Sequence, residues 1–309
     1  MRIDILAMSL VSFIGVTINV YLFMRFAHSK KKPFSSFHKL CLFKTVPNVI
    51  ICSIFCFYAI PLSSLQMTIE SIPRLQNIVF SQILGGFSYT LGPLIQICMA
   101  LNRFFVLFFP FAKMEFDFIP LTGIAMLLCA LLATGPIVAS VLSGCYLVYD
   151  PSFLVFLPEL EECAHLMDRG TFVMICTLAV ISNSINIIIF GKLLKDKMGG
   201  MSENQKNKRR KKWVSMFTQS VLQDILQVID ITNYNFVSKL VNTDWWSFIF
   251  CCLSFSMIYV LDGAVMLYFH TDFTILKNQK KVSAVSQVSI GLSSGGVGGG
   301  ATVKTNAWT

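Results

Sequence analysis

Seven stretches of mostly apolar residues alternate with polar segments along the chain, at 4–26, 40–62, 78–101, 118–142, 171–194, 214–237 and 246–269. A helix needs about 20 such residues to cross the ~30 Å hydrocarbon core of a bilayer. The sixth stretch is the least apolar, and a strict hydropathy threshold would miss it. The pattern predicts an all-α membrane protein, a bundle of seven transmembrane helices.

The composition points to the same class. Only 13% of the 309 residues are charged and 55% are hydrophobic, whereas soluble domains carry about 25% charged residues. With the N-terminus outside, all basic residues lie in or beside inner segments except Arg2, Arg74, Arg169 and Lys239. Cytoplasmic loops are enriched in Lys and Arg. We therefore predict an outer N-terminus, and we assign the +9 net charge to the inner membrane surface, with no nucleic acid as a partner.

Two connecting segments are long. Segment 143–170 is acidic and predicted outside, and segment 195–212 is basic and predicted inside. The basic segment has two readings, an ordinary inner loop or a docking site for a partner. Beside anionic lipid each basic residue gains ~1 kcal/mol, so membrane lipids are expected partners. We divide the chain into a seven-helix domain over 1–275 and a flexible, Gly/Ser-rich cytoplasmic tail over 276–309.

The predicted sixth helix carries a polar stripe. At 100° per residue its polar side chains fall within one arc, with Asp224 at the edge of an arc made of Gln219, Gln223, Gln227, Asp230 and Tyr234. Such a stripe has to face the bundle interior. We expect the two inner glutamines to form structural hydrogen bonds. Asp230 lies nearer the outer end, where it either contacts a ligand or pairs with Tyr234 or a serine of helix seven for structure alone.

Other polar residues lie within apolar stretches. Asp262 in helix seven needs a partner, and Asn19 and Asn48 of helices one and two are candidates. We interpret these three residues as an internal activation switch. Lys44, one turn into helix two, is expected to extend to the inner surface and to have no functional role.

Eight of the ten cysteines lie in apolar runs, where a thiol behaves as a small buried hydrophobe. Cys145 and Cys163 lie in a polar segment, and they are the one plausible disulfide. The four histidines are scattered, so we expect neither a metal nor a cofactor. We found no paired intramembrane aspartates, His-Glu-x-x-His motif or Ser/His pair, so the chain is not expected to be an enzyme.

Several short motifs follow one another in a specific order: Leu40-Cys41 with Lys44 and Asn48, Asn102-Arg103-Phe104 before Phe109-Pro110, Gly144-Cys145 before Tyr149-Asp150-Pro151, Gln223-Asp224 before Ile229-Asp230, and Asp262-Gly263. Over about 5–275 the chain resembles the nematode serpentine chemoreceptors of class x, within the rhodopsin-like G-protein-coupled receptors. The resemblance implies a chemosensory receptor in the plasma membrane of sensory-neuron cilia. It also implies that Asn102, Arg103 and Phe104 meet a heterotrimeric G protein on the inner side.

The chain departs from the wider superfamily in ways that narrow the ligand. Helix six lacks proline, helix seven lacks Asn-Pro-x-x-Tyr, and the outer end of helix three lacks cysteine. Helix seven has no lysine to bind retinal as a Schiff base. Helix three has no acid to pair with a cationic amine. We therefore expect a small, neutral molecule, and the candidate ligand residues are Gly85, Ser88, Tyr89, Gln227 and Asp230.

A seven-span transporter or channel is the alternative function. Against it, the chain shows no inverted repeat and no Gly/Pro-broken half-helices at the membrane midplane. Clear inverted symmetry between the hydropathy profiles of residues 4–142 and 118–269 would favour transport.

Overall fold

The computed structural model describes residues 3–28, 36–109, 121–195 and 203–269. The chain falls into two units, Met1–Leu267 and Tyr268–Thr309, and the helices below are described within the first unit. The predicted tail over 276–309 lies outside the described residues, and the division at residue 275 stays a prediction.

The described part of the chain forms seven helical rods. Three are single helices, α1 (Ile3–Ala27), α8 (Glu161–Lys195) and α9 (Glu203–Asn235). The second rod joins α2 (Ser36–Ile54), η1 (Phe55–Ala59) and α3 (Ile60–Ser64), and the third joins α4 (Arg74–Ser81), η3 (Gln82–Ser88) and α5 (Tyr89–Phe108). The fourth joins α6 (Leu121–Ala133) to α7 (Gly135–Ser143), and the seventh joins α10 (Asp244–Ser247), η5 (Phe248–Leu253) and residues 254–269. Short turns η2 (Ile69–Ser71) and η4 (Val237–Lys239) lie between rods.

Local sequence explains the interruptions. Pro136 follows Gly135 at the start of α7, and proline has no backbone N–H to continue the helix from α6. Three rods contain π-helical turns, η1, η3 and η5. Turns of this kind are frequent at functional sites in helices. Glycines Gly85 and Gly86 lie inside η3.

The seven-helix prediction is confirmed, and its sixth member behaves as expected. Among the described residues, six rods are long and apolar enough to cross a membrane, and α9 is not one of them. Helix α9 nevertheless packs against α8 and α5 inside the bundle. The prediction that the basic segment 195–212 is a loop was wrong from Glu203 onward, because α9 already begins there. Its Lys, Arg, Gln and Glu residues are good helix formers, and 196–202 lie outside the described residues.

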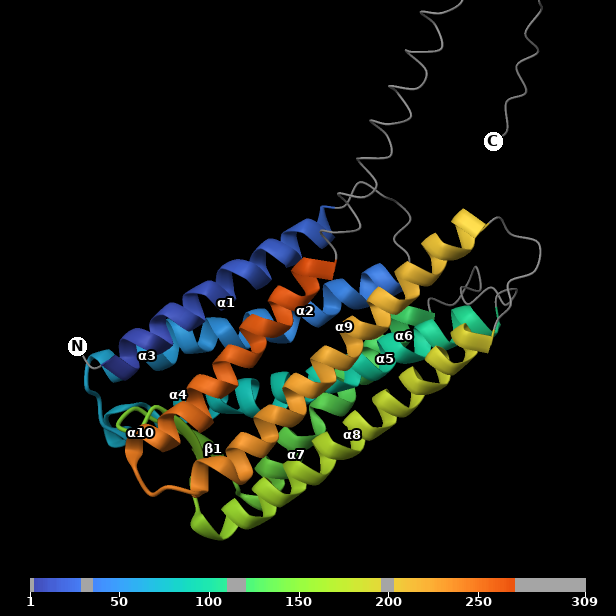
Figure 1. The fold of residues 1–309 in the computed structure, drawn as a ribbon. Helices are drawn as coiled ribbons and strands as arrows, with labels where there is room; N and C mark the ends of the chain where they lie inside the picture. Colours follow the sequence, from blue (N-terminus) through green and yellow to red (C-terminus); the bar gives the residue numbers. More distant parts are fainter. Residues whose placement is uncertain (1–2, 29–35, 110–120, 196–202, 270–309) are drawn as a thin grey trace, which may run out of the picture. The chain divides into compact units, whose positions relative to one another are not determined.

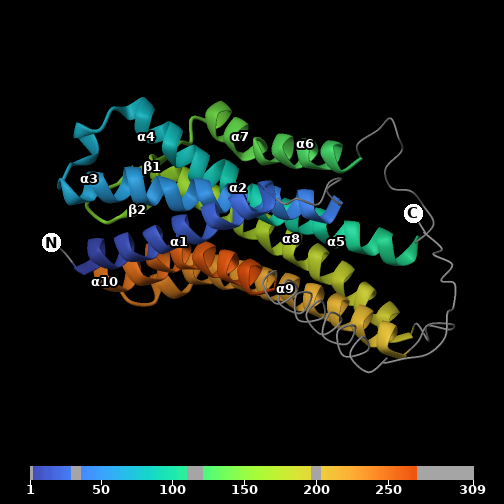
Figure 2. The same ribbon diagram turned by 90° about the horizontal axis from the view of Figure 1, so that it is seen from above.

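The rods pack as neighbours in sequence and across the bundle, α1 on α2, α2 on α5, α5 on α8, and α8 on α9 (Figure 1). Helices α6 and α7 lie at the rim (Figure 2). In the most apolar 18-residue stretch of each rod, 17% of the residues are buried for Leu121–Ser143, whereas 56% are buried for Ser36–Ser64 and for Arg74–Phe108. The second and third rods are therefore the centre of the bundle.

A small hairpin covers one end of the bundle, beside the start of α1 and α10 (Figure 1). Strands β1 (Leu147–Asp150) and β2 (Val155–Pro158) are antiparallel, with Leu147 opposite Pro158 and Asp150 opposite Val155. We call residues 147–158 the hairpin and this end of the bundle the hairpin end. Gly144 ends α7 with a φ of 70°, a left-handed conformation that glycine adopts without strain.

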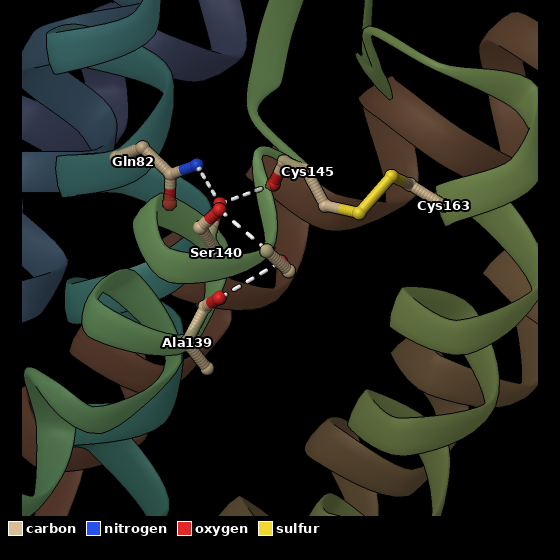
Figure 3. Close-up of a disulfide and its surroundings, with 6 residues drawn as sticks. Gln82, Ala139, Ser140, Cys145 and Cys163 are labelled. Atoms are coloured by element: carbon tan, nitrogen blue, oxygen red, sulfur yellow. Dashed lines mark hydrogen bonds between the residues drawn. A yellow bond between two sulfur atoms is a disulfide. The ribbon is translucent and has the colours of Figure 1, made fainter.

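The predicted disulfide Cys145–Cys163 is confirmed, with the two Cα atoms 5.5 Å apart. It links Cys145, two residues before β1, to the first turn of α8 (Figure 3). On the bundle side, Gln82 Nε2 donates to Ser140 Oγ at 2.7 Å, and Ser140 Oγ donates to the carbonyl of Cys145 (Figure 3). The start of the hairpin is thus held to both α7 and α8.

Candidate ligand cavity and its connections

A cavity of about 150 Å³ lies beneath the hairpin. Its lining comes from six rods and the hairpin: Phe55, Gln82, Leu84, Gly85, Gly86, Tyr89, Thr90, Pro136, Leu147, Val155, Phe156, Pro158, Met167, Thr171, Met174, Asp230, Ile231, Tyr234, Cys251, Cys252 and Phe255. Each of the three π-helical turns contributes to it. Apolar cavities of this size hold molecules as small as benzene.

Asp230 is the one carboxylate of this lining. Its side chain is 2% exposed, and its Oδ1 atom has no hydrogen-bond partner within the described structure. Tyr89, which is 6% exposed, contributes a hydroxyl to the same lining. The Tyr89 ring packs against Phe255, with centroids 5.6 Å apart. The two residues form a polar end in a mostly apolar cavity.

The structure brings together three of the five predicted ligand residues. Gly85, Tyr89 and Asp230 line the cavity, but Ser88 and Gln227 do not. Ser88 is fully buried with an unpartnered hydroxyl, and Gln227 lies about one turn before Asp230 along α9, with its Nε2 near Gly92. Ser88 lies within the π-helical turn η3, whose residues do not follow the register of a regular α-helix.

The hairpin is the part of the cavity wall that sequence reasoning missed. Leu147, Val155, Phe156 and Pro158 all line the cavity. The sequence contained a partial signal, because Gly144-Cys145 and Cys163 bracket this segment. A loop constrained at both ends has to return over the bundle, but its strands and register follow from contacts with α4 and the second rod.

Tyr149 fastens the hairpin to the bundle and is 0% exposed. The Asn77 side chain in α4 accepts from Tyr149 N–H at 2.8 Å and donates to Tyr149 C=O at 2.9 Å. The Tyr149 hydroxyl lies 2.7 Å from Ser63 Oγ and donates to the Ala59 carbonyl at 3.2 Å. Ser63 Oγ also donates to the Pro151 carbonyl. Every polar group of Tyr149 is therefore paired, and the hairpin has one defined position over the cavity.

Arg103 lies near the opposite end of α5 and is only 3% exposed. Its Nη1 donates to the Met216 carbonyl of α9 at 3.1 Å and to Asn186 Oδ1 of α8 at 3.4 Å. Its Nε and Nη2 have no partner in the described residues. Asn102 is also buried, and Phe104 stacks on Phe108 with ring centroids 4.3 Å apart. Arg103 thus joins α5 to the same helix that carries Asp230.

The polar stripe of α9 faces the interior between these two sites. Gln219 and Gln223 are 2% and 3% exposed, as their pattern predicts. Gln219 Nε2 and both polar atoms of Gln223 are unpartnered in the described structure. Asp224 is satisfied, because Ser182 Oγ of α8 donates to it at 2.9 Å. The expected structural hydrogen bonds of the two glutamines are therefore absent in this arrangement.

Asn19, Asn48 and Asp262 meet in the interior. Asn48 Nδ2 donates to Asp262 Oδ2 at 2.6 Å and to Asn19 Oδ1 at 3.2 Å. The expectation for Lys44 was wrong, because its side chain is buried, with Nζ 3.7 Å from Asp262 Oδ2 and 3.3 Å from the Gly92 carbonyl. Asp262 pairs with the buried ammonium of Lys44, and a buried charge without such a partner would be strongly destabilising.

No metal site is formed in the described part of the chain, where no three His, Cys, Asp or Glu side chains come together. The described part of the chain thus has seven helical rods, a cavity covered by the hairpin, and a buried arginine at the far end of the third rod. This architecture is that of a seven-transmembrane receptor.

Comparison with known families agrees with that class. Residues 10–270 match the family model for the serpentine type 7TM GPCR chemoreceptor Srx. The match covers well over half of the chain, so the protein belongs to the Srx chemoreceptor family, a family of receptors rather than of enzymes. No curated protein matches the chain.

Proposed function

We propose that the protein is a chemosensory receptor that binds a small, neutral molecule in the cavity beneath the hairpin and activates a heterotrimeric G protein. The hairpin end then faces the outside, with the N-terminus, as the distribution of basic residues predicts. We place the receptor in the plasma membrane of sensory-neuron cilia, in line with the family to which it belongs.

The observation that carries the proposal is the buried, unpartnered oxygen of Asp230 in the cavity. Buried polar groups in native proteins are nearly always hydrogen bonded. A ligand with one hydroxyl group would supply the missing donor to Asp230. The apolar lining would receive the rest of the molecule.

The same helix connects the cavity to the inner end. Helix α9 presents Asp230 to the cavity and the Met216 carbonyl to Arg103. A ligand that binds Asp230 more tightly in one position of α9 shifts the population toward that position. If α9 moves, Arg103 loses its Met216 partner and becomes available, with Asn102 and Phe104, to the G protein. Asn19, Asn48 and Asp262 would adjust in the same transition.

The ligand-binding part is tested by Asp230→Asn in cells that express promiscuous G proteins, screened with a panel of volatiles and metabolites. We expect near-normal surface expression and a potency loss of tenfold or more, which corresponds to ~1.4 kcal/mol. Asp244→Asn is the matched control, because Asp244 is exposed and lies outside the cavity lining. An unchanged dose-response curve for every active compound would remove Asp230 from the site.

The signalling part is tested by Arg103→Ala. We expect loss of signalling at matched surface expression, because the variant keeps the bundle but lacks the cation at its inner end. Arg25→Ala, which removes a basic residue from the same predicted side, serves as the control. Normal signalling by Arg103→Ala would reduce Arg103 to an ordinary inner-side basic residue.

A further inference from the structure

We propose that Leu147 of the hairpin, seated against Gly85 of η3, sets the length of the molecules that the cavity admits. The inference rests on the proposed function for its biological meaning, and it goes further by naming the residue pair that determines ligand size. It predicts a receptor tuned within a homologous series of compounds that share one polar group.

The contact between the two residues is unusually close. A Cβ atom built on Gly85 would lie 2.5 Å from Leu147 Cδ2, a distance that real Cβ contacts do not reach. Leu147 therefore occupies the space that a side chain at position 85 would fill. Both residues line the cavity, so the tip of Leu147 forms its wall at this point.

The position of this contact relative to Asp230 and Tyr89 is the reason why we expect it to limit the length of a ligand. Gly85 precedes Tyr89 by four residues, which is about one helical turn. A ligand hydrogen bonded at Asp230 and Tyr89 would extend from there through the apolar part of the cavity. Leu147 lies in that part of the wall, and it limits how far an apolar chain extends.

The hairpin holds Leu147 in place. Tyr149, two residues later, points to the same side of β1 and is fixed by Asn77 and Ser63. The Cys145–Cys163 disulfide fixes the chain two residues earlier. Because Leu147 is held from both sides, its side chain forms a wall of fixed position, and only its tip is free to shift.

The first experiment measures cavity size without a ligand. Purified full-length receptor in lipid nanodiscs is treated with alkyl methanethiosulfonates from methyl to hexyl. Each transfers its alkylthio group to a cysteine thiol, which forms a disulfide and releases methanesulfinic acid. Mass spectrometry then follows the peptide that carries Cys251 and Cys252, both in the cavity lining. The longest alkyl group that labels this peptide reports the available length.

Leu147→Ala removes three carbon atoms from the wall, so we expect the limiting alkyl chain to lengthen by two or three carbons. Gly85→Ala displaces the tip of Leu147 toward the open space of the cavity, so the limit is expected to shorten by at least one carbon. In the Leu147→Ala background, Gly85→Ala should change the limiting alkyl chain length little further, because no Cδ atom remains to be displaced. Leu157→Ala, on the same hairpin but 41% exposed and outside the lining, is the matched control and should leave the limit unchanged.

An equal limit in the wild type and in Leu147→Ala would overturn the proposal. So would an equal shift in Leu157→Ala, or the absence of any labelling even by the methyl reagent. These outcomes do not depend on finding an agonist.

The second experiment concerns signalling and separates this inference from the proposed function. For any compound that activates the wild type, homologues two or three carbons longer should gain at least tenfold in potency on Leu147→Ala. If no compound activates the wild type, the proposed function fails while the labelling result still decides the role of Leu147. If compounds activate the wild type and their rank order by length is the same in Leu147→Ala, the function stands and this inference fails.

Discussion

Tyr149 of the hairpin and the inward-facing side chains of α9 are both polar and buried, but they differ in their hydrogen bonding. At the hairpin end, the N–H, carbonyl and hydroxyl of Tyr149 are all paired with Asn77, Ser63 or Ala59. Along α9, Gln219, Gln223 and Asp230 each keep at least one buried polar atom without a partner in the described residues. A fully satisfied network fixes one geometry, whereas an unsatisfied one favours any change that supplies partners. We therefore assign the hairpin to shaping the cavity and α9 to responding when a ligand binds there.

The largest effect is expected where an unsatisfied buried charge is created deliberately. Lys44→Met leaves Asp262 without its cation, and removal of one partner of a buried ion pair destabilises by about 3–5 kcal/mol. Thermal unfolding of the purified receptor measures the loss. The double variant Lys44→Met/Asp262→Asn removes both charges and should recover much of it. An equal loss in the single and double variants would show that the pair is not coupled.

The disulfide gives the next largest effect. Its two cysteines are 18 residues apart, and closing a ring of that size stabilises by roughly 3 kcal/mol. Cys145→Ser/Cys163→Ser should lower the unfolding temperature and release the hairpin. Cys176→Ser removes a free, half-buried thiol and should leave the unfolding temperature close to that of the wild type. Equal unfolding temperatures of the two variants would mean that the disulfide does not hold the hairpin.

Asn77→Ala tests the satisfied network directly. It leaves the N–H and C=O of Tyr149 buried without their side-chain partners, and an unsatisfied buried group costs roughly 1–3 kcal/mol. We expect a destabilisation of about 2 kcal/mol, together with a loss of the size limit that Leu147 imposes. Asn235→Ala, whose side chain only donates to a carbonyl of its own helix, is the control. A stable Asn77→Ala receptor with an unchanged size limit would contradict the anchoring role.

The exposed ion pair of the hairpin end should matter less and depend on pH. Arg74 Nε lies 2.8 Å from Glu159 Oε1 and Nη2 lies 3.0 Å from Oε2, and these hydrogen bonds lower the pKa of Glu159 from its ordinary 4.5. A lowered pKa in the folded state stabilises above the ordinary value, and this stabilisation is lost as the pH falls through the folded-state value. The difference in unfolding temperature between the wild type and Glu159→Gln should therefore be present at neutral pH and shrink as the pH falls below 4.5. Glu162→Gln, at another exposed glutamate of the same outer segment, is the control for the loss of one negative charge.

The smallest change in stability is expected on α9 itself. Asp230→Asn replaces a buried, incompletely paired carboxylate with a neutral group of similar shape. Burial of an unpaired charge is unfavourable, so the unfolding temperature should stay the same or rise even though ligand potency falls. A clear drop in unfolding temperature would show that Asp230 stabilises the fold, as the hydrogen-bonded Tyr149 does, and would contradict the proposed difference between α9 and the hairpin.

The sequence pattern was sufficient to predict the structural elements that lie in the membrane. Seven apolar stretches, the inward stripe of α9 and the pairing of Cys145 with Cys163 all follow from local composition, because a bilayer demands apolar surfaces and internal hydrogen bonds. The grouping of Asn19, Asn48 and Asp262 followed from the same demand. Gly85, Tyr89 and Asp230 line the cavity, and the sequence predicted them as ligand residues from an inward face and a position near the predicted outer end.

Tertiary structure decided what depends on partners distant in sequence. The burial of Lys44 depends on Asp262, 218 positions away along the chain, and sequence alone treats a lysine near a helix end as a surface residue. Ser88 lies within the π-helical turn η3 and off the cavity wall, and the hydropathy pattern does not mark a turn of this kind. The hairpin register, and with it the placement of Leu147 on Gly85, is set by Asn77 and Ser63 in two different rods. The pattern of polar and apolar residues shows which face of a helix avoids lipid. It carries no information on which side chain, distant in the sequence, contacts that face.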